Sequence, residues 1–246
     1  GNVYGGGLGQ KAKDAVEANA ELGIEAQDEV PAVEAFVGGD VRVTLDGAKV
    51  PGSIFGCNNL NGTPKGHVVV LVKRTVDSAK DGSKTREART LDYASGYDVA
   101  AVYGGGNQAD YIPTNSTITL PAKNADDYGA KKELLDSART EVIIEGCDRT
   151  SIDFVYGGGN AAAVHATDVT IKGSYIVNTV YGGGNGKSTD TFTNPGADVG
   201  LKALSDDGTP YDESHPTKEA YGSGKAVTKL LGGYINDVYG GSNTKG

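Results

Sequence analysis

One short phrase recurs six times along this chain of 246 residues. In its fullest form the phrase reads Val-Tyr-Gly-Gly-Gly-Asn, and its copies start at residues 3, 54, 102, 155, 180 and 238, the second being degenerate. Successive copies therefore start 51, 48, 53, 25 and 58 residues apart. A phrase repeated at such intervals indicates an array of similar structural units, so it constrains the fold more strongly than any local motif.

The shortest interval shows the repeated unit without an insertion. Between the fourth and fifth copies, Val169 and Ile171 alternate with polar residues, Gly173 follows, and a second β-prone run covers 176–181. Alternation with a period of two is typical of a strand with one buried face. The unit is therefore a strand, a glycine corner, a second strand and a triple-glycine corner.

The same order precedes most of the other copies, with first strands expected at about 40–46, 141–145 and 226–231. Before the third copy, 68–72 and the segment around Leu91 both qualify as the first strand. A unit this short cannot bury its apolar stripe alone, whereas stacked units bury a continuous core. We therefore expect an all-β fold, a parallel β-helix (β-solenoid) of about six coils.

We expect a single domain over residues 1–246. Glycine suits the corners because it reaches positive φ and allows close backbone approach. The chain begins and ends inside copies of the phrase, which favours a fragment of a longer array or a subunit that stacks end to end, since bare strand edges invite pairing.

The long intervals contain insertions, which repeat arrays extrude as loops on one side. We expect a helix over 11–22 and another over 126–138, because both segments are rich in helix-forming residues. Bracing of the array is favoured over recognition as the role of these segments, which lie at about 8–36, 77–96, 108–140 and 187–225.

Composition and charge narrow the range of partners. The net charge is −9, with 23 basic against 32 acidic residues and no basic cluster, which disfavours binding to nucleic acid. No apolar run is long enough to insert this segment into a membrane. Cys57 and Cys147 fall at different corners of different units, so we expect two free, largely buried thiols.

Two positions of the phrase form columns in a stacked array. Exposed aromatic rings would bind the flat faces of sugars, but burial of the column with hydrogen-bonded hydroxyls is the interpretation we favour. The asparagines are expected to satisfy backbone groups at the turns. The aromatic column consists of Tyr4, Phe55, Tyr103, Tyr156, Tyr181 and Tyr239, and the asparagine column of Asn58, Asn107, Asn160, Asn185 and Asn243.

The sequence gives little support for catalysis, and we expect a protein that is not an enzyme. Asp153 and Asp237 lie near the phrase in different registers, so they form no column of carboxylates. Glycine strings that mimic nucleotide-binding motifs are explained by the repeat. One acidic loop offers weak Ca²⁺ binding as an alternative to simple solvation, through Asp206, Asp207, Asp212 and Glu213.

The repeated phrase, placed after a strand–glycine–strand unit, resembles the repeats of large secreted bacterial surface proteins of adhesin type. The resemblance covers the six copies, about half of the chain. It implies an extracellular, cell-surface location and a structural or adhesive role, with host or microbial surface glycans or proteins as partners. A carbohydrate-binding or polysaccharide-cleaving β-helix protein is the first alternative, and a self-assembling extracellular filament subunit is the second.

Overall fold

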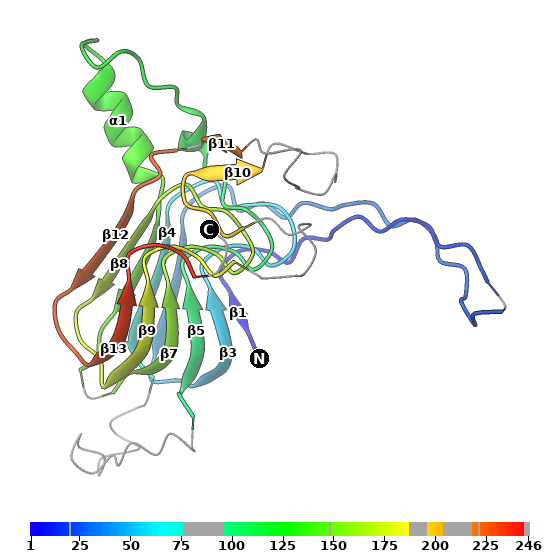
Figure 1. The fold of residues 1–246 in the computed structure, drawn as a ribbon, viewed down its shortest axis with the longest axis horizontal. Coiled ribbons are helices and arrows are strands. Elements are labelled where there is room, and N and C mark those ends of the chain that lie inside the picture. Colours follow the sequence, from blue (N-terminus) through cyan, green and yellow to red (C-terminus); the bar gives the residue numbers. More distant parts are fainter. Residues whose placement is uncertain are drawn as a thin grey trace.

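The computed structural model consists mainly of β-strands arranged in two parallel sheets (Figure 1). The prediction of an all-β fold built on parallel strands is confirmed at this level. The two sheets remain separate and have open edges. The structure describes residues 1–19, 21–75, 96–147, 149–186, 196–203, 218–220 and 222–243.

The six copies of the phrase lie at the ends of the six strands of one sheet. Their valines or isoleucines pair in register from strand to strand, and so do the aromatic residues that follow them. In spatial order the strands are β1 (Val3–Tyr4), β3 (Val50–Phe55), β5 (Val99–Tyr103), β7 (Ser151–Tyr156), β9 (Ile176–Tyr181) and β13 (Ile235–Tyr239).

The second sheet has five parallel strands, and the chain visits the two sheets in turn. Each passage adds one strand to the sheet beside the strand that was laid down before it. Two segments were candidates for the first strand before the third copy. The segment at 68–72 does form a strand, over 68–74, and Leu91 lies outside the described residues. The strands in spatial order are β12 (Ala226–Leu230), β8 (Thr167–Ile171), β6 (Thr140–Ile144), β4 (Val68–Arg74) and β2 (Val41–Asp46).

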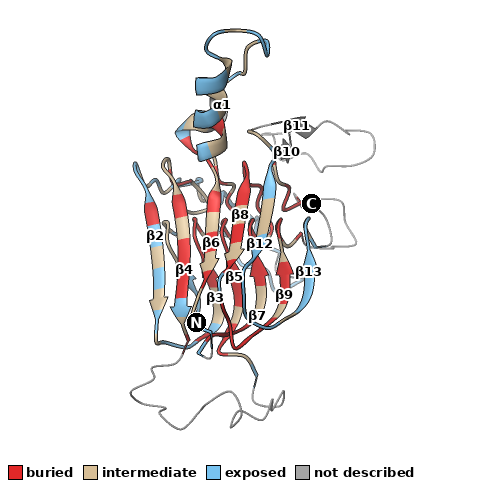
Figure 2. Cartoon of the chain, turned by 90° about the vertical axis from the view of Figure 1, so that its left-hand side faces the viewer, coloured by how far each residue is buried: buried red, intermediate tan, exposed pale blue. Residues whose placement is uncertain are grey.

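The core lies between the two sheets and is built almost entirely from β-branched side chains. Burial is highest on the central strands and falls at the outermost ones, as Figure 2 shows. Alternation places every second side chain of a strand in this layer. The buried members are Val50, Ile54, Val99, Val102, Ile152, Val155, Val177 and Val180 from the first sheet and Val70, Val72, Val142, Ile144, Val169 and Ile171 from the second.

The first glycine of the phrase is where successive repeats touch. A methyl group placed on this glycine would lie 2.5 Å or less from the carbonyl oxygen of the same glycine one repeat further on, for each of Gly5, Gly56, Gly104, Gly157 and Gly182. None of these residues has a positive φ. The prediction of close approach is therefore confirmed, whereas positive φ belongs to the opposite corner, at Gly47, Gly146 and Gly233.

The insertions differ in structure from one another. The predicted second helix is present as α1 (Tyr128–Ser137), preceded by the short 3-10 helix η2 (Thr114–Thr117). The last insertion contributes the antiparallel pair β10 (Leu201–Ala203) and β11 (Lys218–Ala220). In the part of the chain that the structure describes, no helix is long and apolar enough to cross a membrane.

The predicted helix over 11–22 is wrong, because this segment forms one side of a two-stranded antiparallel arm. Reciprocal backbone hydrogen bonds join the two sides at every third residue, from Gln10 and Val33 outwards to Asn19 and Ile24. Helix propensity is a weak preference, and a short helix with no apolar face to bury is marginal in water. The arm extends away from the sheets (Figure 1).

The contact between repeats predicts a position-dependent effect of alanine. Gly104→Ala should lower the free energy of unfolding by about 1–3 kcal/mol, because the added methyl group overlaps a backbone oxygen that cannot move alone. Gly240→Ala changes the same position in the last repeat, where nothing lies within 4 Å. This control should be unchanged or up to about 1 kcal/mol more stable. Urea unfolding compares the two, and equal effects would contradict the packing argument.

Candidate functional site

The aromatic residues of the phrase form one continuous stack on the outer side of the six-stranded sheet. Neighbouring ring centroids are 4.7 to 5.0 Å apart, and the interplanar angles are 14° or less. The rings of Phe55, Tyr103 and Tyr156 are buried, Tyr4 and Tyr181 are partly buried, and Tyr239 at the end of the stack is 51% exposed. The stack is therefore covered over most of its length.

The asparagines form a ladder of side-chain hydrogen bonds beside the aromatic stack. Asn107, Asn160, Asn185 and Asn243 each donate an amide N–H to the asparagine one repeat earlier, at 2.8 to 3.0 Å. The first acceptor is Asn59, not Asn58 as the sequence analysis expected. Counting from the first residue of the second copy places Asn59 at the sixth position, so the sequence contained this signal.

Asn58 has a different role from the ladder. Its fully buried amide accepts a hydrogen bond from Gly7 N–H and donates to the carbonyl oxygens of Ala35 and Asn61. Asn58 therefore satisfies backbone groups where the arm joins the sheets.

The tyrosine hydroxyls contact the asparagine ladder. The hydroxyl of Tyr103 lies 3.4 Å from the Asn160 side chain and accepts a hydrogen bond from the Asn185 amide at 3.3 Å. Burial raises the pKa of Tyr103 to about 12, so its hydroxyl stays protonated at neutral pH. Ring and hydroxyl are both used inside the protein, which leaves the central tyrosines unavailable as a ligand surface.

Truncation of a central ring should therefore destabilise the fold. Tyr156 is only 3% exposed, and Tyr156→Ala should cost about 3–5 kcal/mol of unfolding free energy, as large aromatic truncations do. Tyr239→Ala removes the half-exposed ring at the end of the same stack and should cost roughly 1 kcal/mol. Chemical unfolding followed by far-UV circular dichroism measures both, and a Tyr156→Ala variant as stable as the parent would contradict the burial.

The remaining predicted positions do not combine into a site. The acidic loop, with Asp206, Asp207, Asp212 and Glu213, lies outside the described residues. Among the residues that are described, no group of three or more His, Cys, Asp or Glu side chains is placed to hold a metal ion.

Both cysteines are free thiols in the structure. Cys57 is buried as expected, but Cys147 is exposed, so the prediction of burial is wrong for that residue. Cys147 lies in the connection after β6, outside the packed layer between the sheets.

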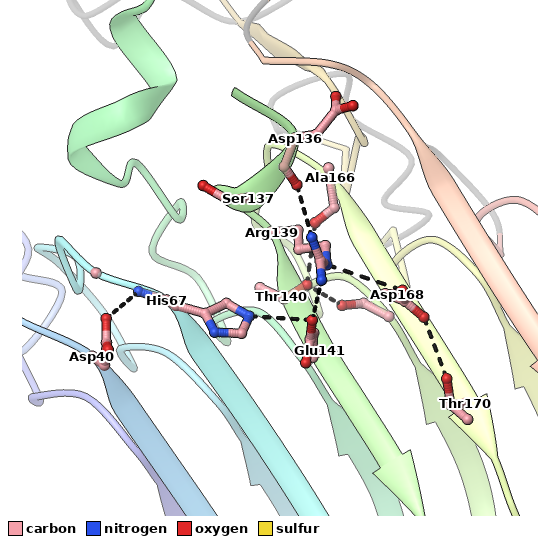
Figure 3. Close-up of polar contacts among 12 residues, drawn as sticks. Asp40, His67, Asp136, Ser137, Arg139, Thr140, Glu141, Ala166, Asp168 and Thr170 are labelled. Atoms are coloured by element: carbon pink, nitrogen blue, oxygen red, sulfur yellow. Dashed lines mark hydrogen bonds and ion pairs between the residues drawn. The ribbon is translucent and has the colours of Figure 1, made fainter. Parts of the chain in front are cut away.

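A second group of polar residues gathers where the strands of the five-stranded sheet begin. Asp40, His67 and Arg139 each directly precede a strand, β2, β4 and β6 respectively. Glu141 and Asp168 are the second residues of β6 and β8 and pair in register. Because the strands are parallel, all of them start at the same end of the sheet, beneath the end of α1 (Figure 3).

Arg139 is the centre of this polar network. Its guanidinium donates to the carboxylate of Glu141 and to the carbonyl oxygen of Asp136 at 3.1 Å, and it lies 4.0 Å from the Asp168 carboxylate. The Asp168 carboxylate also accepts from the Lys229 ammonium at 2.8 Å. The network thus joins the last turn of α1 to three neighbouring strands, β6, β8 and β12.

The surroundings of Glu141 fix its protonation state. His67 Nε2 lies 3.5 Å from Glu141 Oε1, which is an ion-pair distance and long for a hydrogen bond. The His67 ring and then the Arg139 guanidinium lower the pKa of Glu141 to about 2, against the opposing effect of burial. Glu141 is therefore ionised at neutral pH, so it has no proton to donate, and its low pKa makes it a weak base.

An open cavity of about 520 Å³ lies beside this network. One wall comes from the insertion, as η2 and the end of α1, and the other from the residues that lead into β2 and β4. Its lining combines the polar or charged residues Asp40, Lys65, His67, Asn115, Ser137 and Arg139 with Gly66, Pro113 and Ala138. We take this cavity as the candidate functional site.

Sequence reasoning missed this site, because its residues come from segments far apart in the chain. One signal was present, since Asp40, His67 and Arg139 all stand directly before an alternating strand. The insertion that forms the second wall has no motif that predicts where it folds back.

Comparisons with known proteins give no indication of function. Protein-family models, curated proteins and solved structures were each compared with the chain, and none matches it.

The lowered pKa of Glu141 makes the stability depend on acidity in one direction. An unfolded chain has a pKa near 4.5 at this residue, against about 2 in the folded protein. Ionised Glu141 therefore stabilises the fold above pH 4.5, and this contribution disappears as the pH falls from 4.5 towards 2. The stability difference between the parent and Glu141→Gln should shrink over that range. Urea unfolding at stepped pH measures it, and a constant difference would contradict the assignment.

Proposed function

We propose that this protein is a non-enzymatic cell-surface module, a stiff β-solenoid scaffold that presents its insertions for attachment. The observation that carries the proposal is the division of the chain into two parts. The parallel strands, the glycine contacts and the two side-chain ladders recur from strand to strand along the stack. Among the described residues, the arm over 10–33 and the insertion with α1 project from that stack and differ from each other.

The internal packing supports a role as a stiff spacer. Each repeat contacts the next through backbone hydrogen bonds, the buried layer between the sheets, the stacked rings and the asparagine amides. The Tyr103 hydroxyl also contacts Asn185 two repeats further on, so the side-chain ladders tie together more than adjacent repeats. A bacterial extracellular setting agrees with the resemblance of the repeats to adhesin-type surface proteins.

The insertions supply the surfaces that an attachment module requires. The arm over residues 10–33 stands clear of the sheets, and its exposed apolar side chains include Leu22. The α1 insertion forms one wall of the open cavity where the strands of the five-stranded sheet begin. Attachment through such surfaces needs no catalytic group.

Polysaccharide cleavage has weaker support. Glu141 and Asp168 do bring two carboxylates together on neighbouring strands. Both carboxylates contact basic side chains, and Glu141 remains ionised at neutral pH. Assembly into filaments through the edge strands β2 and β12 is a third possibility, which concentration-dependent sedimentation velocity tests directly.

Adhesion is tested with beads that carry the folded chain. We expect these beads to be retained on cell surfaces under flow, and to be retained several times more strongly than beads carrying the chain unfolded by heat. The same preparation should release no reducing ends or unsaturated products from neutral and acidic polysaccharides. Retention equal to that of the unfolded control, or steady product release, would overturn the proposal.

A further inference from the structure

The cavity beside α1 contains an acidic and a basic side chain that do not neutralise each other. Asp40 Oδ1 accepts the backbone N–H of His67 at 2.8 Å, and no basic side chain among the described residues pairs with the Asp40 carboxylate. The Lys65 ammonium lies over the ring of Phe36, 5.0 Å from its centroid, and has no carboxylate partner in the same described part. Both groups keep hydrogen-bonding capacity for a ligand.

The backbone beneath these side chains is held in place. Lys65 N–H donates to Val37 O at 2.8 Å, and Lys65 O accepts from Thr114 N–H at 3.0 Å. The hydroxyl of Tyr111, a fully buried residue, donates to Gly66 O at 2.7 Å. The site is therefore built before any ligand arrives, which lowers the entropic cost of binding.

Gly66 is required for the shape of this site. A methyl group at this position would overlap the Asp40 carboxylate and the backbone of Gly39. The close approach of the two segments places the Asp40 carboxylate beside the lining residue His67, whose N–H it accepts.

The charges of the site favour a neutral ligand. Of the three basic side chains in the lining, Arg139 is paired with Glu141, and His67 lies at ion-pair distance from the same carboxylate. Asp40 and Lys65 then contribute one negative and one positive charge. An anionic ligand would be repelled by Asp40, and a cationic ligand would be repelled by Lys65. A polar ligand without net charge therefore fits this site best.

The groups that remain match the hydrogen-bonding pattern of sugar hydroxyls. A carboxylate accepts hydrogen bonds from two neighbouring hydroxyl groups, and an ammonium donates to hydroxyl oxygens. The Asn115 amide adds a donor and an acceptor on the opposite wall. Beside Lys65, the ring of Phe36 is 55% exposed and offers an apolar face of the kind that packs on the C–H side of a sugar.

We infer that this cavity binds a neutral sugar unit of a surface glycan, with Asp40, Lys65 and Asn115 as its polar contacts and Phe36 at its margin. The volume of about 520 Å³ lies within the range of small-molecule sites and admits one or two sugar rings. The inference rests on the proposed attachment function and names its ligand class.

Saturation-transfer NMR and calorimetry with a panel of free sugars test this inference. The panel contains glucose, galactose, mannose, fucose and their disaccharides, with glucuronate and glucosamine as charged members. We expect at least one neutral sugar to bind. Binding of glucuronate or glucosamine alone would overturn the assignment of a neutral ligand, and no binding at millimolar concentrations would overturn the site.

Two variants with matched controls locate the binding. Asp40→Asn keeps the oxygen that accepts His67 N–H but removes the charge, and it should weaken binding about tenfold or more. Asp40 directly precedes β2, and Asp46 is the last residue of that strand. Asp46→Asn should therefore leave the affinity unchanged. Phe36→Ala should weaken binding severalfold, whereas Leu22→Ala, which removes an exposed side chain from the tip of the arm, should not.

The outcomes separate this inference from the proposed function. Sugar binding that survives both Asp40→Asn and Phe36→Ala would place the ligand elsewhere and overturn the site. Circular dichroism of each variant verifies that loss of binding is not loss of fold. If the beads adhere to cells although no sugar binds in the cavity, the attachment function stands and the sugar site falls.

Discussion

The contact between the first glycine of each phrase and the backbone of the next repeat is the constraint on which the rest of this structure depends. A side chain at that position would collide with a carbonyl oxygen, so successive repeats approach this closely only when the position is glycine. The register of the six-stranded sheet follows from the same strands, because a shift of one residue would turn the core residues outwards.

Once the register is fixed, the two ladders follow from it. Identical positions lie one strand spacing apart, which is close to the spacing of stacked rings and of hydrogen-bonded amides. The asparagine ladder lies beside the aromatic stack, so Tyr103 also meets Asn185, which is 82 residues and two repeats further on. The ladders then bury polar groups that would otherwise be costly, since hydroxyls and amides satisfy one another.

The insertions give the molecule its asymmetric features. Because the regular part closes its own hydrogen bonds, a long segment can leave the stack and return without disturbing the pairing of the strands. The insertion with α1 returns directly into β6, and Arg139 at that junction joins the helix end to Glu141. This return places the wall of the cavity against the residues before β2 and β4, so the candidate site exists only where an insertion meets the array.

The sequence by itself determined the repeating unit, because alternation of Val169 and Ile171 and the recurrence of the phrase are local patterns with direct physical meaning. It also indicated α1, whose residues favour a helix. Tertiary structure decided that the Ala-rich and Glu-rich segment after Lys11 pairs with a distant partner instead of forming a helix. It also decided that the tyrosine rings are covered. The cavity was beyond local reasoning for the same reason, since Asp40, Lys65 and Asn115 are brought together only by the stacking of repeats and the fold of an insertion.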